Sequence, residues 1–270
     1  MSKSKVNLYK MEDSPRQEEK IAAALELLGL EGMRSSFPEL SKRFILNNQS
    51  PSDFMVELLE KEINWKEESR KNRWIKAAKF PWQKTLKDFD FSYQPSINER
   101  QIYELGSCRF INEGENIIFF GQAGVGKTHL SIALGLEAIN KGFDVKFFTL
   151  ENIVELIEKY GDGIKLDNFI SNLRTAKVLI IDEMERFEVS LTASKQLSRL
   201  ITSRYQEHKP TIFTSNKSFE GWSNIFGDTS TANKVIDRIN HRSVIINIQG
   251  ESYRVKDKLE ILKEAAQAVI

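Results

Sequence analysis

The sequence predicts an α/β fold: a five-stranded, mainly parallel sheet with helices on both faces, preceded by a small α-helical N-terminal domain. Five short apolar runs rich in β-branched and aromatic residues alternate with helix-length segments after about residue 115, whereas the residues before about 80 show only helical spacing. Strands that alternate with helices need crossover connections, and such connections make neighbouring strands parallel.

The composition is that of a globular chain. Its 270 residues are 40% hydrophobic and 29% charged, which is enough apolar material for a large core. The formal net charge is only +1, so contact with nucleic acid would have to rest on local charge. The single cysteine, Cys108, excludes an intrachain disulfide, and residues 1–20 hold no apolar segment of the signal-peptide type. From these two features we expect a cytoplasmic protein. No run reaches the roughly 18 apolar residues of a membrane span, so we expect no membrane partner.

Two helical patterns open the chain, one over residues 17–30 and one from Ser50 onward. Ser50 can cap the second helix, with Pro51 at its first position and Asp53 at its third. Apolar residues at helical spacing follow in both, namely Ile21, Ala24, Leu25 and Leu28 in the first and Phe54, Met55, Leu58, Leu59 and Ile63 in the second.

Prolines, aromatic residues and charges replace this periodicity between about residues 80 and 97. We therefore expect a helical N-terminal domain over residues 1–85, with a basic segment at its end, and an α/β domain over residues 86–270. In the second domain the predicted strands are 116–120, 145–149, 178–181, 211–214 and 244–248, and the helical patterns between them are 127–140, 151–160, 168–174 and 193–206.

Directly after the first predicted strand, residues 121–128 read GQAGVGKT and match G-x-x-x-x-G-K-[ST], with a helical pattern behind them. Glycines let backbone N–H groups turn inward around a phosphate, and the helix N-terminus adds its dipole. In this motif Lys127 reaches the β- and γ-phosphates and the Thr128 hydroxyl ligates Mg²⁺. The alternative is an ordinary glycine-rich turn, and His129 by itself is more typical of a packed helix residue. The predicted cofactor-binding residues are Gly121, Gln122, Ala123, Gly124, Val125, Gly126, Lys127, Thr128 and His129.

The apolar run 178–181 ends in two adjacent acids, Asp182 and Glu183. A buried strand can end in acids merely because it reaches solvent. With a phosphate loop about 55 residues upstream, however, Asp182 is placed to hold the Mg²⁺ hydration shell and Glu183 to orient and deprotonate water. An additional strand between the two motifs separates the chain from simple nucleotide kinases, and no guanine-reading N-K-x-D follows Asp182. The pair therefore favours ATP hydrolysis.

The run 211–214 leads into Ser215 and Asn216. An Asn at a strand end is commonly only a turn former. If this strand lies between the strand before the phosphate loop and the strand before the acids, the Asn216 amide can hold the attacking water against Glu183. We therefore expect Asn216 in the catalytic site.

The order of these motifs resembles the AAA+ superfamily of P-loop NTPases, and more narrowly the group of IstB-type transposition helper ATPases and DnaC-type helicase loaders. The IstB branch is the better match. The most specific stretches are W-x-x-I-F-G-D at 222–228 and G-E-S-Y-R at 250–254. The other shared segments are GQAGVGKTHL at 121–130, ALG at 133–135, VLIIDE at 178–183, TSN at 214–216, DRI at 237–239 and HR at 241–242. The chain departs from the family at Gln122 and Ala123, where prolines are common, and at 184–187, where a segment with Gly and Leu is usual.

The resemblance implies an AAA+ core, ATP and Mg²⁺ as cofactors, and a homo-oligomer. Arg238 matches the arginine finger that enters the neighbouring subunit's site, and Arg254 matches the sensor arginine that contacts its own nucleotide. Taken alone, either arginine is ordinary as a surface ion-pair residue. Charge that accumulates on a transferred phosphoryl group, however, needs a fixed guanidinium.

Residues 70–87 form a basic segment that contains no acid. Since the whole chain carries a net charge of +1 and this segment +7, the rest carries −6. A solvated helix face is the ordinary interpretation of such a run, but its localisation favours contact with a phosphate backbone. No base-reading motif is visible, so binding should be independent of sequence. The basic residues are Arg70, Lys71, Arg73, Lys76, Lys79, Lys84 and Lys87, interleaved with Trp74, Phe80 and Trp82.

These features predict an ATP- and Mg²⁺-dependent ATPase that assembles on double-stranded DNA and assists a transposase. One alternative is a DnaC-like helicase loader, whose N-terminal region would hold a hexameric helicase. A second alternative is an ATP-gated DNA clamp for which hydrolysis is incidental.

Overall fold

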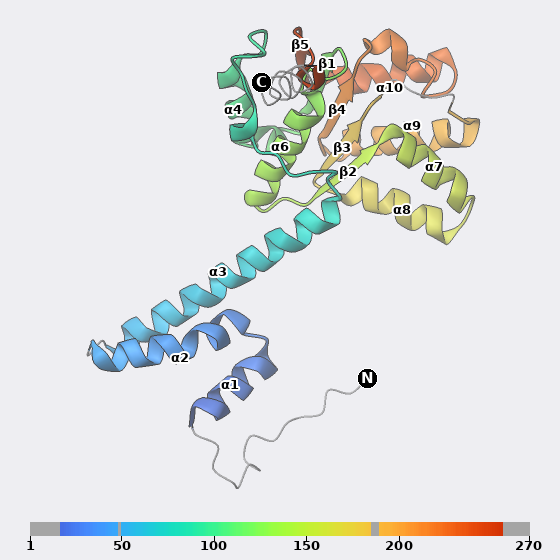
Figure 1. Cartoon of the computed structure of the whole chain (residues 1–270). Coiled ribbons are helices and arrows are strands. Elements are labelled where there is room, and N and C mark those ends of the chain that lie inside the picture. Colours follow the sequence, from blue (N-terminus) through green and yellow to red (C-terminus); the bar gives the residue numbers. More distant parts are fainter. Residues whose placement is uncertain (1–16, 48–49, 185–188, 256–270) are drawn as a thin grey trace, which may run out of the picture. The chain divides into compact units, whose positions relative to one another are not determined.

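The computed structural model describes residues 17–47, 50–184 and 189–255 (Figure 1). Contacts along the chain divide it into two compact units whose border lies between Arg73 and Trp74. Residues 185–187, in the stretch where the sequence departs from the family pattern, lie outside the described residues.

The N-terminal unit is helical, as the sequence predicts. It contains α1 (Gln17–Leu28), α2 (Glu31–Leu46) and most of α3 (Pro51–Ala78). The Ser50 hydroxyl accepts a hydrogen bond from the Asp53 amide at 3.1 Å, which is the expected cap of α3. The small core is Met33, Leu40 and Leu58. At Gly32 the backbones of α2 and α3 approach so closely that a Cβ would lie 2.6 Å from the Lys61 carbonyl oxygen.

The C-terminal unit is built on a five-stranded sheet in the order β2-β3-β4-β1-β5. Every neighbouring pair is parallel. The strands are β1 (Asn116–Gly121), β2 (Val145–Thr149), β3 (Val178–Asp182), β4 (Thr211–Ser215) and β5 (Ser243–Ile248). The five predicted strands are confirmed, and β4 lies between β1 and β3 as the interpretation of Asn216 required. Phe120 is in register with Ser215, and Thr149 with Asp182. The carboxyl ends of β1, β2, β3 and β4 therefore lie at the same end of the sheet.

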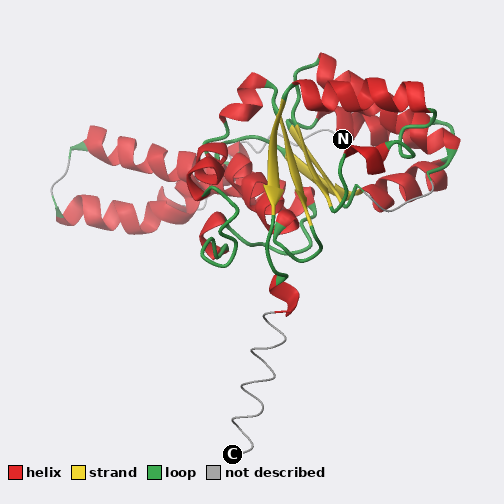
Figure 2. Cartoon of the chain, turned by 90° about the horizontal axis from the view of Figure 1, so that it is seen from above, coloured by secondary structure: helices red, strands yellow, loops and turns green. Residues whose placement is uncertain are grey.

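Helices cover both faces of this sheet (Figure 2). One face carries α4 (Glu99–Gly106), α5 (Arg109–Glu113) and α6 (Lys127–Asn140), and the other α7 (Leu150–Tyr160), α8 (Ile164–Thr175), α9 (Leu191–Gln206) and α10 (Thr229–His241). Two single turns, η2 (Leu86–Asp88) and η3 (Phe219–Trp222), complete the unit. Along β1, Ile117 and Phe119 enter one core while Ile118 enters the other. Burial on both sides explains why the strands are continuous apolar runs.

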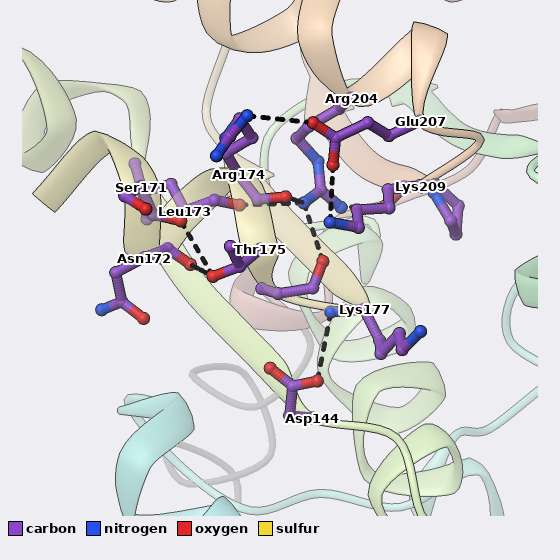
Figure 3. A network of polar contacts seen from close by, with 12 residues as sticks. Asp144, Ser171, Asn172, Leu173, Arg174, Thr175, Lys177, Arg204, Glu207 and Lys209 are labelled. Carbon is purple, nitrogen blue, oxygen red and sulfur yellow. Dashed lines mark hydrogen bonds and ion pairs between the residues drawn. The ribbon is translucent and has the colours of Figure 1, made fainter. Parts of the chain in front are cut away.

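Arg204 of α9 links the end of α8 to the residue before β4 through hydrogen bonds (Figure 3). Its side chain is buried, and its guanidinium donates to the carbonyls of Leu173 and Ala176 at 2.8 Å each and of Pro210 at 2.6 Å. The Thr211 hydroxyl accepts a further bond from Nε at 3.0 Å. Burial lowers the pKa of Arg204 to about 9, so the group stays charged at neutral pH. The last carbonyls of α8 thereby gain partners inside the protein.

Among the helices of the described ranges, none combines the length and the apolar character that a membrane crossing requires.

Candidate nucleotide site

The loop after β1 has the backbone form that the motif predicts. Gly124 and Gly126 adopt φ values of 82° and 101°, which side-chain-bearing residues rarely take. A Cβ on Gly124 would lie 2.0 Å from the Ser252 hydroxyl oxygen, and one on Gly126 would lie 2.5 Å from the Phe89 ring. The loop is therefore closed in by two segments distant in sequence, and glycine is required at both positions.

Lys127, the first residue of α6, turns its ammonium group back into the loop. The residue is only 7% exposed, and Nζ donates to the carbonyls of Gly121 at 2.8 Å and Gln122 at 2.7 Å. It also donates to Asn216 Oδ1 at 2.5 Å. The fold thus brings the predicted catalytic amide to the predicted phosphate-binding lysine across 89 residues of chain.

Thr128 and Asp182, the two predicted Mg²⁺ ligands, are in direct contact. The Thr128 hydroxyl lies 2.9 Å and 3.0 Å from the two Asp182 carboxylate oxygens. Asp182 is 4% exposed at the end of β3. A hydroxyl and a carboxylate beside a phosphate-binding loop are the hard oxygen donors that Mg²⁺ prefers, so the residues present fit this ion.

Glu183 leaves the line of β3 at a sharp turn. Its φ of 58° is in the left-handed region. The Glu183 amide donates to the Thr214 hydroxyl at 3.0 Å, and the Met184 amide donates to the Thr214 carbonyl at 2.9 Å. The Glu183 side chain is half-buried in the wall of a cavity that it shares with the loop.

That cavity has a volume of about 370 Å³, within the range of small-molecule sites. The predicted residues that line it are Ala123, Gly124, Gly126, Lys127, Thr128, His129, Glu183, Asn216 and Arg254. The lining residues that sequence reasoning did not assign to this site are Trp82, Lys84, Asp88, Asp90, Thr214 and Tyr253.

Other predicted residues lie around this cavity. Gly121 and Gln122 line an adjoining cavity on the side of β5, and Asp182 lines another on the side of β2. Val125 is 1% exposed and packs into the core.

Arg238 lies elsewhere. It is on α10, where Nη1 donates to the Thr202 hydroxyl at 2.8 Å, and it borders a small recess with Asn116 and Thr211. Those two residues begin β1 and β4. Arg238 therefore lies near the amino ends of these strands, whereas the nucleotide cavity lies at the carboxyl ends.

His129 is both packed and part of the lining. Nε2 donates to the Thr85 carbonyl at 2.9 Å, and the ring meets Phe89 edge-on at 5.2 Å between centroids. Burial lowers the pKa of His129, so the ring is neutral at pH 7. The segment 82–90 is thereby held against the first turn of α6, and this contact brings Trp82 and Lys84 to the cavity. No local pattern in the sequence distinguishes such a segment from a linker.

The segment with the sequence GESYR is fastened to the loop. The Tyr253 amide donates to the Gly124 carbonyl at 2.9 Å, its hydroxyl donates to the Asp90 carbonyl, and Gln94 Nε2 donates to the Glu251 carbonyl at 2.7 Å. Burial raises the pKa of Tyr253 to about 12, so the phenol keeps its proton. Arg254 follows directly and is exposed at the mouth of the cavity. The adjacency of Tyr253 to Arg254 was a signal in the sequence that could have identified the tyrosine.

Solved structures with a similar fold include that of DnaI, with a TM-score of 0.52, 20% identity, and coverage of 63% of this chain and 90% of that one. The crystal structure of the DnaC helicase loader has a TM-score of 0.50 and 21% identity, and covers 66% of this chain and 99% of that one. At such identities the likeness concerns the fold, which is that of an AAA+ P-loop core.

Sequence relatives are closer. A protein of Geobacillus stearothermophilus named "Insertion sequence IS5376 putative ATP-binding protein" is 39% identical over 240 residues, which cover 89% of this chain and 95% of the relative. The corresponding IS21 protein of Pseudomonas aeruginosa is 38% identical over 206 residues, covering 76% and 77%. The model of the family described as "IstB-like ATP binding protein" matches residues 23–261. Because that model matches most of the chain and these relatives are more than a third identical to it over the aligned residues, the chain belongs to the IstB-like ATP binding protein family.

Proposed function

We propose that this protein is an ATP- and Mg²⁺-dependent ATPase of the cytoplasm that assembles on double-stranded DNA and assists the transposase of an insertion sequence. The observation that carries the ATPase part is the contact of Thr128 with Asp182 under the phosphate loop, with Glu183 on the wall of the same cavity. The insertion-sequence names of the relatives support the transposition part.

In this proposal the loop amides and Lys127 bind the β- and γ-phosphates, and Arg254 contacts them from the mouth of the cavity. Thr128 and Asp182 hold Mg²⁺, which when bound with ATP offsets the phosphate charge. Glu183 takes a proton from the attacking water, which Asn216 orients. The new bond joins the water oxygen to the γ-phosphorus, and the bond from that phosphorus to ADP breaks. Arg238 completes the site of a neighbouring subunit.

The ATPase proposal is tested with two variants that separate binding from hydrolysis. Glu183→Gln keeps the shape of the side chain and removes the base, so ATP binding should persist while turnover falls by about 10²–10⁴-fold. Lys127→Ala should lose binding itself. Phosphate release and binding of a fluorescent ATP analogue are measured side by side. Equal turnover by Glu183→Gln and the parent protein would remove Glu183 from the mechanism, and DNA-bound assembly without any hydrolysis would favour the clamp.

The DNA part of the proposal rests on the basic segment 70–87 within a chain whose remainder is acidic. Lys84 lines the nucleotide cavity, so it is the weakest of the seven basic residues as a candidate for contact with DNA. The other six basic residues remain candidates for phosphate-backbone contact that does not depend on base sequence.

Electron microscopy of the protein with ATP, Mg²⁺ and a long random duplex tests this part. Repeated subunits along the duplex are expected, and so is a complex with a transposase if one is encoded beside the gene. A loader would instead form a stoichiometric complex with a replicative helicase and prefer single strands, where bases can stack on aromatic side chains. Bare duplex beside isolated monomers, with a tight helicase complex, would overturn the helper assignment.

A further inference from the structure

Thr214, near the end of β4, connects the two acids of the candidate site. Its side chain is 1% exposed, and its hydroxyl donates to Asp182 Oδ1 while accepting the Glu183 N–H at 3.0 Å. Its carbonyl accepts the Met184 N–H at 2.9 Å. One residue of β4 therefore holds three consecutive residues at the end of β3.

The turn at Glu183 needs these bonds. The β3–β4 register pairs Ile181 with Phe213, and beyond that pair the chain leaves β3 with Glu183 at a φ of 58°. Left-handed backbone at a residue other than glycine persists only where its surroundings impose it. The Thr214 hydroxyl and carbonyl accept the two N–H groups that the turn takes out of the ladder, so they stabilise the conformation that directs Glu183 toward the cavity.

The same hydroxyl also orients Asp182. The carboxylate accepts from Thr128 on α6 and from Thr214 on β4, so it is held between two fixed hydroxyls. A threonine hydroxyl has one donor and two acceptor sites, which suffices for the bonds to Asp182 and Glu183 together. Valine has nearly the same shape and can make neither bond, whereas serine can make both.

We propose that Thr214 is a positioning residue of the ATPase, which sets the metal-binding acid Asp182 and the base Glu183 in one geometry through a single hydroxyl. This proposal rests on the ATPase function proposed above. It assigns to Thr214 no contact with the reacting atoms: its effect passes through the two acids.

The experiment compares Thr214→Val and Thr214→Ser with Thr211→Val as a matched control. Thr211 lies on the same strand, is 2% exposed, and its hydroxyl accepts from buried Arg204, so its loss should lower stability without touching the acids. We expect Thr214→Val to lower kcat by about 10- to 100-fold, the usual effect of removing an outer partner of a metal ligand. KM for ATP should rise by a smaller factor than kcat falls, because the loop and Lys127 are intact. Thr214→Ser should restore most of kcat, and Thr211→Val should keep it.

A second readout does not depend on turnover. Binding of a fluorescent ATP analogue is titrated with and without Mg²⁺, and Thr214→Val should reduce the gain in affinity that Mg²⁺ provides while leaving Mg²⁺-free binding unchanged. Parent-like kcat and a parent-like Mg²⁺ gain in Thr214→Val would overturn the proposal, as would an equal fall in kcat in Thr211→Val. If the parent protein binds ATP without hydrolysing it, the proposed ATPase function fails. The positioning role of Thr214 is then still tested by comparing how much Mg²⁺ raises analogue affinity in the parent protein and in Thr214→Val.

Discussion

At the scale of single residues, Arg204 shows how one buried charge can organise parts of the chain that are distant in sequence. Its donors meet four carbonyls, those of Leu173, Arg174, Ala176 and Pro210, and the Thr211 hydroxyl (Figure 3). Removing the guanidinium would deprive buried acceptors at the end of α8 of this partner, which costs more than the lost bonds were worth.

We therefore expect Arg204→Met to lower the free energy of unfolding by about 3 kcal/mol or more. Arg174→Met is the control, because Arg174 is exposed and its ion pair with Glu207 at 3.2 Å should contribute less than about 1 kcal/mol. Urea denaturation of the nucleotide-free protein measures both. A similarly small decrease in the free energy of unfolding in both variants would mean that Arg204 is not needed to hold α8 in place.

At the scale of elements, the segment 82–90 has a role beyond the one that its charge and aromatic content suggest. Trp82 and Lys84 line the nucleotide cavity, and Phe89 packs against His129 and against Tyr253 at 5.2 Å and 5.7 Å. The segment and the GESYR stretch thus enclose the phosphate loop from two directions. A segment without helix or strand periodicity in the C-terminal unit is thus part of the candidate ligand site.

This arrangement predicts that Trp82→Ala weakens ATP binding about tenfold, because an aromatic ring beside a nucleotide can stack on its base with about 1–3 kcal/mol. Trp65→Ala is the matched control: Trp65 is 41% exposed against 43% for Trp82 and belongs to the N-terminal unit. Titration with a fluorescent ATP analogue is the measurement. Equal affinities of the two variants would exclude Trp82 from nucleotide binding.

At the scale of the whole molecule, Arg238 lies near the amino ends of the strands and the nucleotide cavity at their carboxyl ends. The proposed finger role of Arg238 therefore requires that it act in the site of a neighbouring subunit. Hydrolysis would then depend on assembly, because each site would need a second copy of the chain.

A mixing experiment tests this dependence. Arg238→Ala and Glu183→Gln should each be inactive alone, since one lacks the finger and the other the base. Co-assembled, they can form some interfaces with an intact base and an intact finger, so partial ATPase activity should return. Demonstrated co-assembly without any recovery would place the finger at another residue.

The helices α2 and α10 are among those that were not predicted from the sequence, and of these two only α10 was within reach of a local pattern. In α10, Ala232, Val235 and Ile239 are buried at helical spacing, so the helix has the same kind of signal as those that were predicted. The case of α2 differs, because Gly32 and Pro38 lie inside it and both residues ordinarily argue against a helix. Packing against α3 overrides that preference, and packing is not visible in a local pattern.

Local patterns were enough to predict the strands, the phosphate loop and the adjacency of Asp182 to Glu183, because strand periodicity and loop glycines act within a few residues of chain. The contact of Thr128 with Asp182, the bonds of Thr214 to both acids, and the places of Trp82 and Tyr253 beside the cavity depend on tertiary folding. These contacts join residues between 31 and well over 100 positions apart. They depend on the order of strands and on how helices pack over the sheet, which no single stretch of sequence encodes.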